Sequence, residues 1–176
     1  MNVSTSSLEH IAEDIVSHAL QREGVLVVKP KSDHNGADLL ALLDVSDGAK
    51  FCRIQCKGRS VITTKSQIEI PRKYVTDAFI VILFIEDGEL TEQNVYCFFG
   101  KDIREWNRNK NNDKYTLRFS KSNYKKKLSA HGFGKNTIVN IIKTIINVNI
   151  TGEFKTMGHG YAELTSPIFK IEAQGN

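Results

Sequence analysis

The 176-residue sequence has no apolar run that approaches the roughly 20 residues of a membrane-spanning helix. Its first 23 residues are polar and contain several acids, which is not the composition of a secretory signal. Both absences favour a protein of the cytoplasm with no membrane partner. The length suits one domain with a hydrophobic core of its own.

Cysteine is also scarce, since the chain has only three: Cys52, Cys56 and Cys97. Their number is odd, and the sequence has no C-x-x-C pair and no Cys/His cluster at zinc spacing. A disulfide framework and the common structural zinc sites are therefore excluded. A free cysteine behaves as a small hydrophobic residue, so we expect Cys52 and Cys56 to be buried.

The net charge is only +4, but it is unevenly distributed. The basic segment, Lys101 to Lys135, holds eleven Lys and Arg residues against three acids, a balance of +8 that leaves −4 for the rest of the chain. It contains the cluster Lys125, Lys126 and Lys127, and it ends at Lys135, just before an expected helix whose N-terminus can hold a DNA phosphate. Such a segment indicates either a surface that binds a polyanion or a solvated face that keeps the protein soluble.

The most informative stretch runs from Asn35 to Arg59 and is expected to form a β-hairpin. An apolar run, Ala37–Leu43, and an alternating run, Lys50–Lys57, flank the polar segment Asp44–Gly48. The Asp-Gly pair in that segment is typical of a hairpin turn. One acid, Asp38, lies at the start of the first run.

Side chains alternate between the two faces of a strand, which divides the second run into two sets. Arg53, Gln55 and Lys57 share one face, and Cys52, Ile54 and Cys56 share the other. A polar trio on an otherwise buried strand is costly unless the protein uses it. The alternative is an exposed sheet face, on which these residues need no explanation.

Asp38, Gln55 and Lys57 together resemble the active-site signature of the PD-(D/E)XK nuclease superfamily. In that signature an acid at the start of one strand faces an acid-x-Lys on the next, and Gln55 replaces the second acid here to give a Q-x-K variant. The resemblance covers roughly the first two-thirds of the chain. It implies an α/β fold with a restriction endonuclease-like core, in which helices flank a central mixed β-sheet.

The resemblance also implies a divalent cation, Mg²⁺ or Mn²⁺, that assists hydrolysis of a phosphodiester bond. Asp38 is then the principal ligand, and the Gln55 amide oxygen and the Cys56 backbone carbonyl add to it. Lys57 orients or helps to deprotonate the attacking water, or stabilises charge on the phosphate. A helix ahead of the core strands often adds a glutamate in this family; Glu13 fits that position better than Glu9, and a helix acid that faces solvent is the alternative.

The rest of the chain is expected to supply the other elements of this core. Apolar residues recur at helical spacing through Ser4–Gln21, with Ser6 or Ser7 as the N-cap and Gly24 as the C-cap. The apolar run Ala78–Ile85 reads as a strand buried on both faces. Further expectations are strands at Val25–Val28, Gln67–Pro71, Asn94–Phe99 (antiparallel to Ala78–Ile85) and Tyr115–Phe119, a short helix at Asp102–Asn107, a polar loop at Asn107–Lys114, and a helix at Asn136–Ile146.

The last part of the chain, Val148–Asn176, suggests two or three short strands. We therefore divide the chain into a nuclease-like domain, residues 1–147, and a C-terminal β-rich extension, residues 148–176, packed on the same domain.

Three functions remain open at this point. The leading one is a metal-dependent endonuclease acting on DNA, whose expected DNA-contacting residues are Arg53, Arg59, Lys125, Lys126, Lys127 and Lys135. The second is a catalytically inactive module of the same fold that binds nucleic acid or a partner, which the missing acid at position 55 favours. The third is an assembly protein that oligomerises through its sheet. Many nucleases of this type dimerise to cut two strands, so a homodimer is compatible with the first and the third.

Overall fold

A computed structural model of the chain describes residues 4–31, 36–45, 48–62, 65–88, 94–109, 112–147, 151–152, 154–157 and 161–164. Its elements, in chain order, are α1 (Thr5–Gln21), β1 (Leu26–Val28), β2 (Leu39–Val45), β3 (Gly48–Ser60), β4 (Ser66–Pro71), η1 (Arg72–Tyr74), β5 (Phe79–Glu86), β6 (Val95–Phe99), α2 (Gly100–Arg104), β7 (Asn107–Asn109), β8 (Lys114–Phe119), α3 (Tyr124–Leu128), η3 (Ser129–His131), α4 (Lys135–Asn147), β9 (Thr151–Gly152), β10 (Phe154–Met157) and β11 (Tyr161–Leu164).

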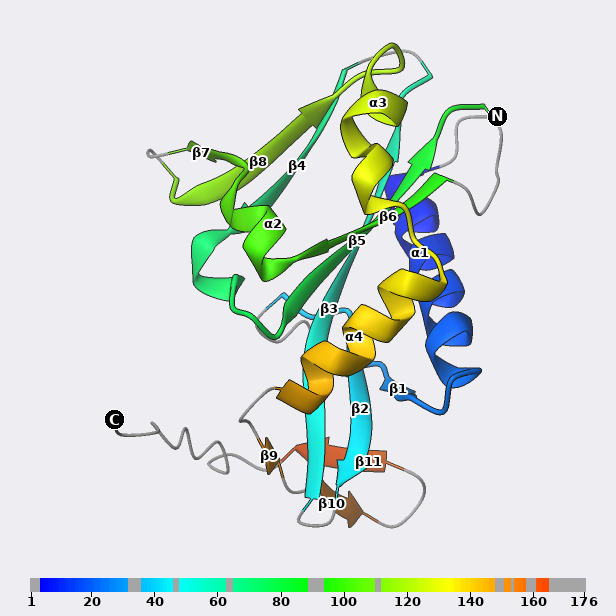
Figure 1. Cartoon of the computed structure of the whole chain (residues 1–176), viewed down its shortest axis with the longest axis vertical. Coiled ribbons are helices and arrows are strands. Elements are labelled where there is room, and N and C mark those ends of the chain that lie inside the picture. The colour runs from blue at the N-terminus through cyan, green and yellow to red at the C-terminus, as the bar shows by residue number, and fades with distance from the viewer. Residues whose placement is uncertain are drawn as a thin grey trace.

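The centre of the molecule is a mixed sheet in the order β1-β2-β3-β5-β6 (Figure 1). The β3–β5 pair is parallel, and the other pairs in this row are antiparallel. The expected hairpin is present, because β2 and β3 pair from Leu39↔Ile54 to Val45↔Gly48. The predicted α/β architecture, a central mixed sheet flanked by helices, is therefore confirmed.

Helix α1 packs against β3 at unusually close range. Its apolar stripe, Leu8, Ala12, Val16 and Leu20, is almost completely buried. A Cβ added at Gly58 of β3 would lie 2.3 Å from the Leu8 Cβ, so only glycine allows this approach. The predicted N-cap at Ser6 or Ser7 is wrong: Ser4 is the cap, and its hydroxyl accepts a hydrogen bond from the Ser7 backbone N–H.

One face of the central sheet is covered by α1 and α4. The thiols of Cys52 and Cys56 lie in this layer with Ile54, and all three residues have no exposed surface. The predicted burial of these cysteines and the predicted division of the strand into two faces are both confirmed. Burial raises the pKa of the Cys52 thiol to about 12, which keeps it protonated and unreactive.

The opposite face is covered by a second, three-stranded sheet in the order β4-β8-β7, together with α2 and α3 (Figure 1). Every residue of β5 is buried between the two layers, as its composition predicts. The predicted polar loop at 107–114 is wrong in part, because its first three residues form β7 and pair with β8 from Asn107↔Thr116. Asparagine favours turns, so the residue types of β7 do not indicate a strand. Pairing with β8 stabilises it.

Only ten residues beyond α4 are described, and all lie in short strands. Strand β9 pairs with β3 at Ala49 and Lys50, and β10 and β11 form an antiparallel hairpin. Short strands were expected in this region; its division from residues 1–147 as an extension stays a prediction. Within the described ranges, no helix is both long and apolar enough to cross a membrane.

Candidate functional site

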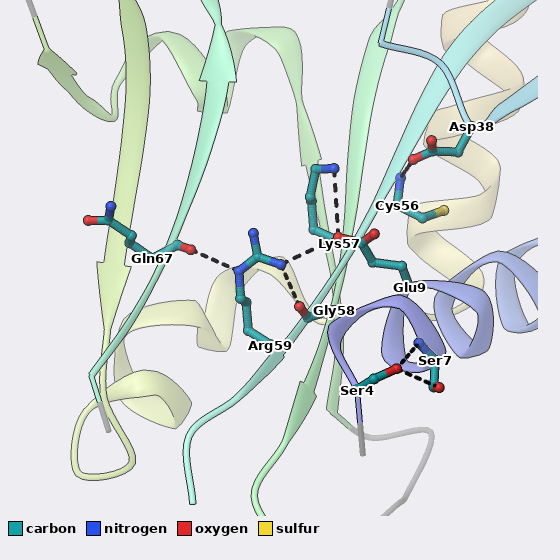
Figure 2. A network of polar contacts seen from close by, with 9 residues as sticks. All are labelled: Ser4, Ser7, Glu9, Asp38, Cys56, Lys57, Gly58, Arg59 and Gln67. Carbon is teal, nitrogen blue, oxygen red and sulfur yellow. Dashed lines mark hydrogen bonds and ion pairs between the residues drawn. The ribbon is translucent and has the colours of Figure 1, made fainter. Parts of the chain in front are cut away.

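The candidate site lies where β2 and β3 separate. Their last paired residues are Leu39 and Ile54, and β3 then continues to Ser60 with β5 on its other side. The backbone N–H of Asp38 still donates to the Ile54 carbonyl, at 2.9 Å. The Cys56 N–H donates instead to Oδ2 of the Asp38 side chain, at 2.7 Å (Figure 2). This carboxylate therefore occupies the position that the next backbone carbonyl of β2 would take.

The approach to Asp38 is shaped by Gly36. This glycine has a φ of +71°, and a Cβ there would lie 2.6 Å from the ring of Tyr74. Residues other than glycine adopt this positive φ only at a cost. The aromatic ring and the turn fix the direction from which the chain enters the site.

Burial raises the pKa of the Asp38 carboxyl, and it is the strongest influence on that group. The Cys56 N–H and the Lys57 ammonium act in the opposite direction, while the charges of Glu13 and Glu9 raise the pKa further. The carboxylate is thus short of the solvation and positive charge that would stabilise it. A cation bound at this point would supply both.

Gln55 lies on the same face of β3 as Lys57 and is only 8% exposed. Its Oε1 is buried and accepts no hydrogen bond from any residue that the structure describes. Leaving a buried carbonyl oxygen unsatisfied costs about 1–3 kcal/mol. An amide oxygen that is buried without a donor is suited to a cation.

Lys57 and Arg59 both contact Glu9 of α1 (Figure 2). Glu9 Oε1 lies 3.7 Å from Lys57 Nζ and 3.4 Å from the Arg59 guanidinium. All three side chains are less than a third exposed, so the network is partly shielded from solvent. Glu9 follows Leu8, the residue that packs on Gly58, and this contact brings its carboxylate to the edge of β3.

Glu13, preferred over Glu9 in the sequence analysis, lies one turn further along α1. Its Oε2 is 2.5 Å from Lys29 Nζ and 3.5 Å from His10 Nδ1. Its charge is still felt by Asp38, but no described contact joins it to Lys57. The glutamate that reaches Lys57 is therefore Glu9. Helical spacing places both residues on one side of α1, and only the glycine contact distinguishes them.

The oxygen atoms around Asp38 and Gln55 suit a divalent cation better than a thiol- or imidazole-binding metal. No group of three or more His, Cys, Asp or Glu residues within the described ranges is arranged as a metal site. The two candidate oxygen ligands are the partly desolvated carboxylate of Asp38 and the unsatisfied amide oxygen of Gln55. Mg²⁺ keeps several waters and needs only one or two carboxylates beside substrate oxygens, so this sparse oxygen set fits it.

The residues expected to contact DNA lie on several elements of the fold. Arg53 is half-buried against the Phe79 ring and donates to Tyr74 and Thr76. Lys125, Lys126 and Lys127 lie on α3, and Lys135 begins α4. Of the predicted set, Arg59 is the one with a described contact to the network of Lys57, through Glu9.

The fold is a mixed α/β arrangement, with helices on a central mixed sheet. It is similar to the solved structure of a bacterial homing endonuclease, I-Ssp6803I, with a TM-score of 0.50 and 18% sequence identity over 78% of this chain and 93% of that one. No family model matches the chain, and no curated protein matches it either. The structural likeness therefore shows the fold.

Proposed function

We propose that this protein is a metal-dependent endonuclease that hydrolyses phosphodiester bonds in DNA, with a Q-x-K variant of the PD-(D/E)XK site. The observation that carries the proposal is the partly buried Asp38 carboxylate, which accepts from the Cys56 N–H and feels the Lys57 charge, beside a strand on which Gln55 Oε1 is buried and unsatisfied. The likeness of the fold to a homing endonuclease supports it.

In this proposal Asp38 and Gln55 hold Mg²⁺ or Mn²⁺, and the Cys56 carbonyl is the third protein ligand. When bound, the cation neutralises charge on the phosphate and makes a water more acidic. Lys57 holds the attacking water and donates hydrogen bonds to the phosphate through Nζ. Glu9 positions that ammonium by its ion pair, and Arg59 binds a neighbouring phosphate of the same strand.

Nicking of supercoiled plasmid DNA in Mg²⁺ or Mn²⁺ tests the proposal. Asp38→Ala and Lys57→Ala should each lower the rate by about 100-fold or more, because one removes the charged ligand and the other removes the group that holds the water. Lys143→Ala, which removes the same charge from an exposed position on α4, should cut like the wild type. If the three variants and the wild type cut at one rate, the activity belongs to a contaminant and the assignment fails.

Two variants compare the roles of the two glutamates of α1, Glu9 and Glu13. Glu9→Gln should lower the rate about tenfold, since a neutral amide positions Lys57 less well. Glu13→Gln should have a smaller effect, because it acts on Asp38 only through its charge. The reverse order would return the role to Glu13.

A catalytically inactive DNA-binding module is the second candidate. The observation that favours it is the absence, within the described ranges, of three metal-ligating side chains grouped together. It predicts binding that weakens steeply with salt and no divalent-dependent cleavage.

A further inference from the structure

The three-stranded sheet β4-β8-β7 turns a polar face away from the core. In its register, Gln67 lies opposite Arg118, and Thr116 lies opposite both Glu69 and Asn107. The alternate residues of the same strands form part of the core: Ile68, Ile70, Leu117 and Phe119. Gln67, Arg118 and Asn107 are exposed, whereas Thr116 is only 3% exposed. We call the three exposed residues, Gln67, Arg118 and Asn107, the polar sheet face.

Arg118 is held in place on this face by a side-chain contact. Its Nε donates to Oε1 of Gln67 at 3.1 Å, across the β4–β8 pair. No residue that the structure describes accepts from its two terminal guanidinium nitrogens. One edge of the guanidinium is therefore fixed, and its terminal nitrogens are left for a planar acceptor pair.

Positive charge and the candidate site both adjoin the polar sheet face. Lys127 Nζ lies 2.7 Å from the backbone oxygen of Arg118. On the other strand, Arg59 donates through Nε to the Gln67 backbone oxygen at 2.9 Å, and the same side chain contacts Glu9 (Figure 2). The face is thus continuous with the network of Lys57, as a substrate-binding surface must be.

Duplex DNA has the shape and charge that fit this face. Neighbouring strands lie about 4.8 Å apart, so two strands with their side chains fit a major groove about 12 Å wide. The terminal nitrogens of an arginine match O6 and N7 of guanine, a pair that the major groove presents. The same fork also fits a phosphate, which carries no base identity, so a base preference that depends on Arg118 distinguishes the two contacts.

We propose that the polar sheet face binds the major groove of duplex DNA, that Arg118 reads a guanine, and that Gln67 positions Arg118. The proposal rests on DNA being the substrate under the proposed function, but it does not depend on cleavage. It assigns sequence preference to residues outside the catalytic group.

Selection from a randomised duplex library in EDTA, which prevents cutting, tests this. The wild type should enrich guanine at one position or more, with roughly 5- to 150-fold discrimination. Arg118→Ala should lose that preference, and Arg118→Lys should lose it while keeping most of the affinity, because the charge remains and the planar fork does not. Gln67→Ala should weaken it.

The matched control is Arg104→Ala. Arg104 belongs to the same basic segment but pairs with Asp77 and not with a residue of this sheet, so its loss should leave the base preference unchanged. Replacing the selected guanine by 7-deazaguanine, which lacks N7, should weaken binding of the wild type and leave Arg118→Ala unaffected. Comparable melting temperatures for all variants confirm that each is folded.

An unchanged preference in Arg118→Ala would overturn the inference, and so would a wild type that prefers single-stranded DNA or RNA or that binds without base preference. These results are distinct from failure of the proposed nuclease, which shows as no divalent-dependent nicking by the wild type. Suppose that the wild type does not cut DNA but prefers guanine, and that Arg118→Ala loses this preference. That result would support the inference on the polar sheet face and overturn the proposed nuclease activity.

Discussion

The two faces of β3 are built from alternate residues of one strand, yet they follow opposite rules. Cys52, Ile54, Cys56 and Gly58 pack against helices, and the three side chains among them have no exposed surface. On the other face, Gln55 has an unsatisfied buried oxygen, and Lys57 and Arg59 share one carboxylate. The first face therefore serves packing alone.

The difference shows how the fold divides its tasks. Close packing on the α1 side fixes β3 and brings Glu9 to the strand edge, so the apolar face positions the polar one. The opposite face of β3 keeps polar side chains, Gln55, Lys57 and Arg59, where apolar residues would pack better. Stability on one side therefore supports a destabilised arrangement on the other.

The largest expected effect comes from breaking the packed face at Gly58. In Gly58→Ala the new Cβ would lie 2.3 Å from the Leu8 Cβ and 2.5 Å from the Leu8 backbone carbon, so α1 must move. We expect a loss of about 3 kcal/mol or more in the free energy of unfolding, measured with urea.

Gly134→Ala is the control for this change, because a Cβ there meets nothing within 4 Å. It should alter the free energy of unfolding by less than about 1 kcal/mol. If Gly58→Ala were as mild as Gly134→Ala, the close contact between α1 and β3 would not exist, and the placement of Glu9 would lose its support.

Local patterns in the sequence sufficed for much of this fold. The amphipathic helix, the hairpin around Asp44–Gly48, the two faces of β3 and the buried strand β5 are all set by spacing and turn residues within a few positions. The strand β7 escaped because Asn107–Asn109 has no strand propensity of its own and is held by β8. Pairing between distant segments is not encoded locally.

The same limit applies to the candidate site. Asp38 and Lys57 are recognisable because a short hairpin connects them in sequence. The choice between Glu9 and Glu13 depends on where α1 meets Gly58, which is a contact between residues 50 positions apart. The Gln67–Arg118 pair also cannot be predicted from the sequence, since its members lie 51 positions apart.

The second prediction tests the face of β3 that carries Gln55. Gln55→Met keeps the side-chain volume and removes the unsatisfied oxygen, so it should raise the free energy of unfolding by about 1 kcal/mol while lowering divalent-dependent nicking. Cys52→Ser, on the packed face of the same strand, introduces a hydroxyl where no surface is exposed. It should lower the free energy of unfolding by about 1–3 kcal/mol. Equal signs for the two changes would mean that the faces do not differ as described.

The smallest effect concerns the proton on Asp38. Burial raises the pKa of this carboxyl above its ordinary 3.8, so the unfolded chain releases the proton at a lower pH than the folded protein does. The resulting penalty on folding is absent well below pH 3.8, grows as the pH rises through that value and is complete above the raised pKa. Asp38→Asn carries no charge and its amide oxygen can still accept from the Cys56 N–H, so it should become more stable than the wild type as the pH rises from 3 to 7.

We expect this gain to stay below about 1 kcal/mol, because the carboxyl is only half-buried and solvent screens its charge. Urea unfolding of both proteins across that pH range measures it. Adding Mg²⁺ at pH 7 should cancel the difference, since the cation stabilises only a folded protein that retains the carboxylate. A stability difference between the two proteins that persists unchanged in Mg²⁺ would show that Asp38 binds no cation. The packed face of β3 would then be the part of this strand whose residues have an explained role.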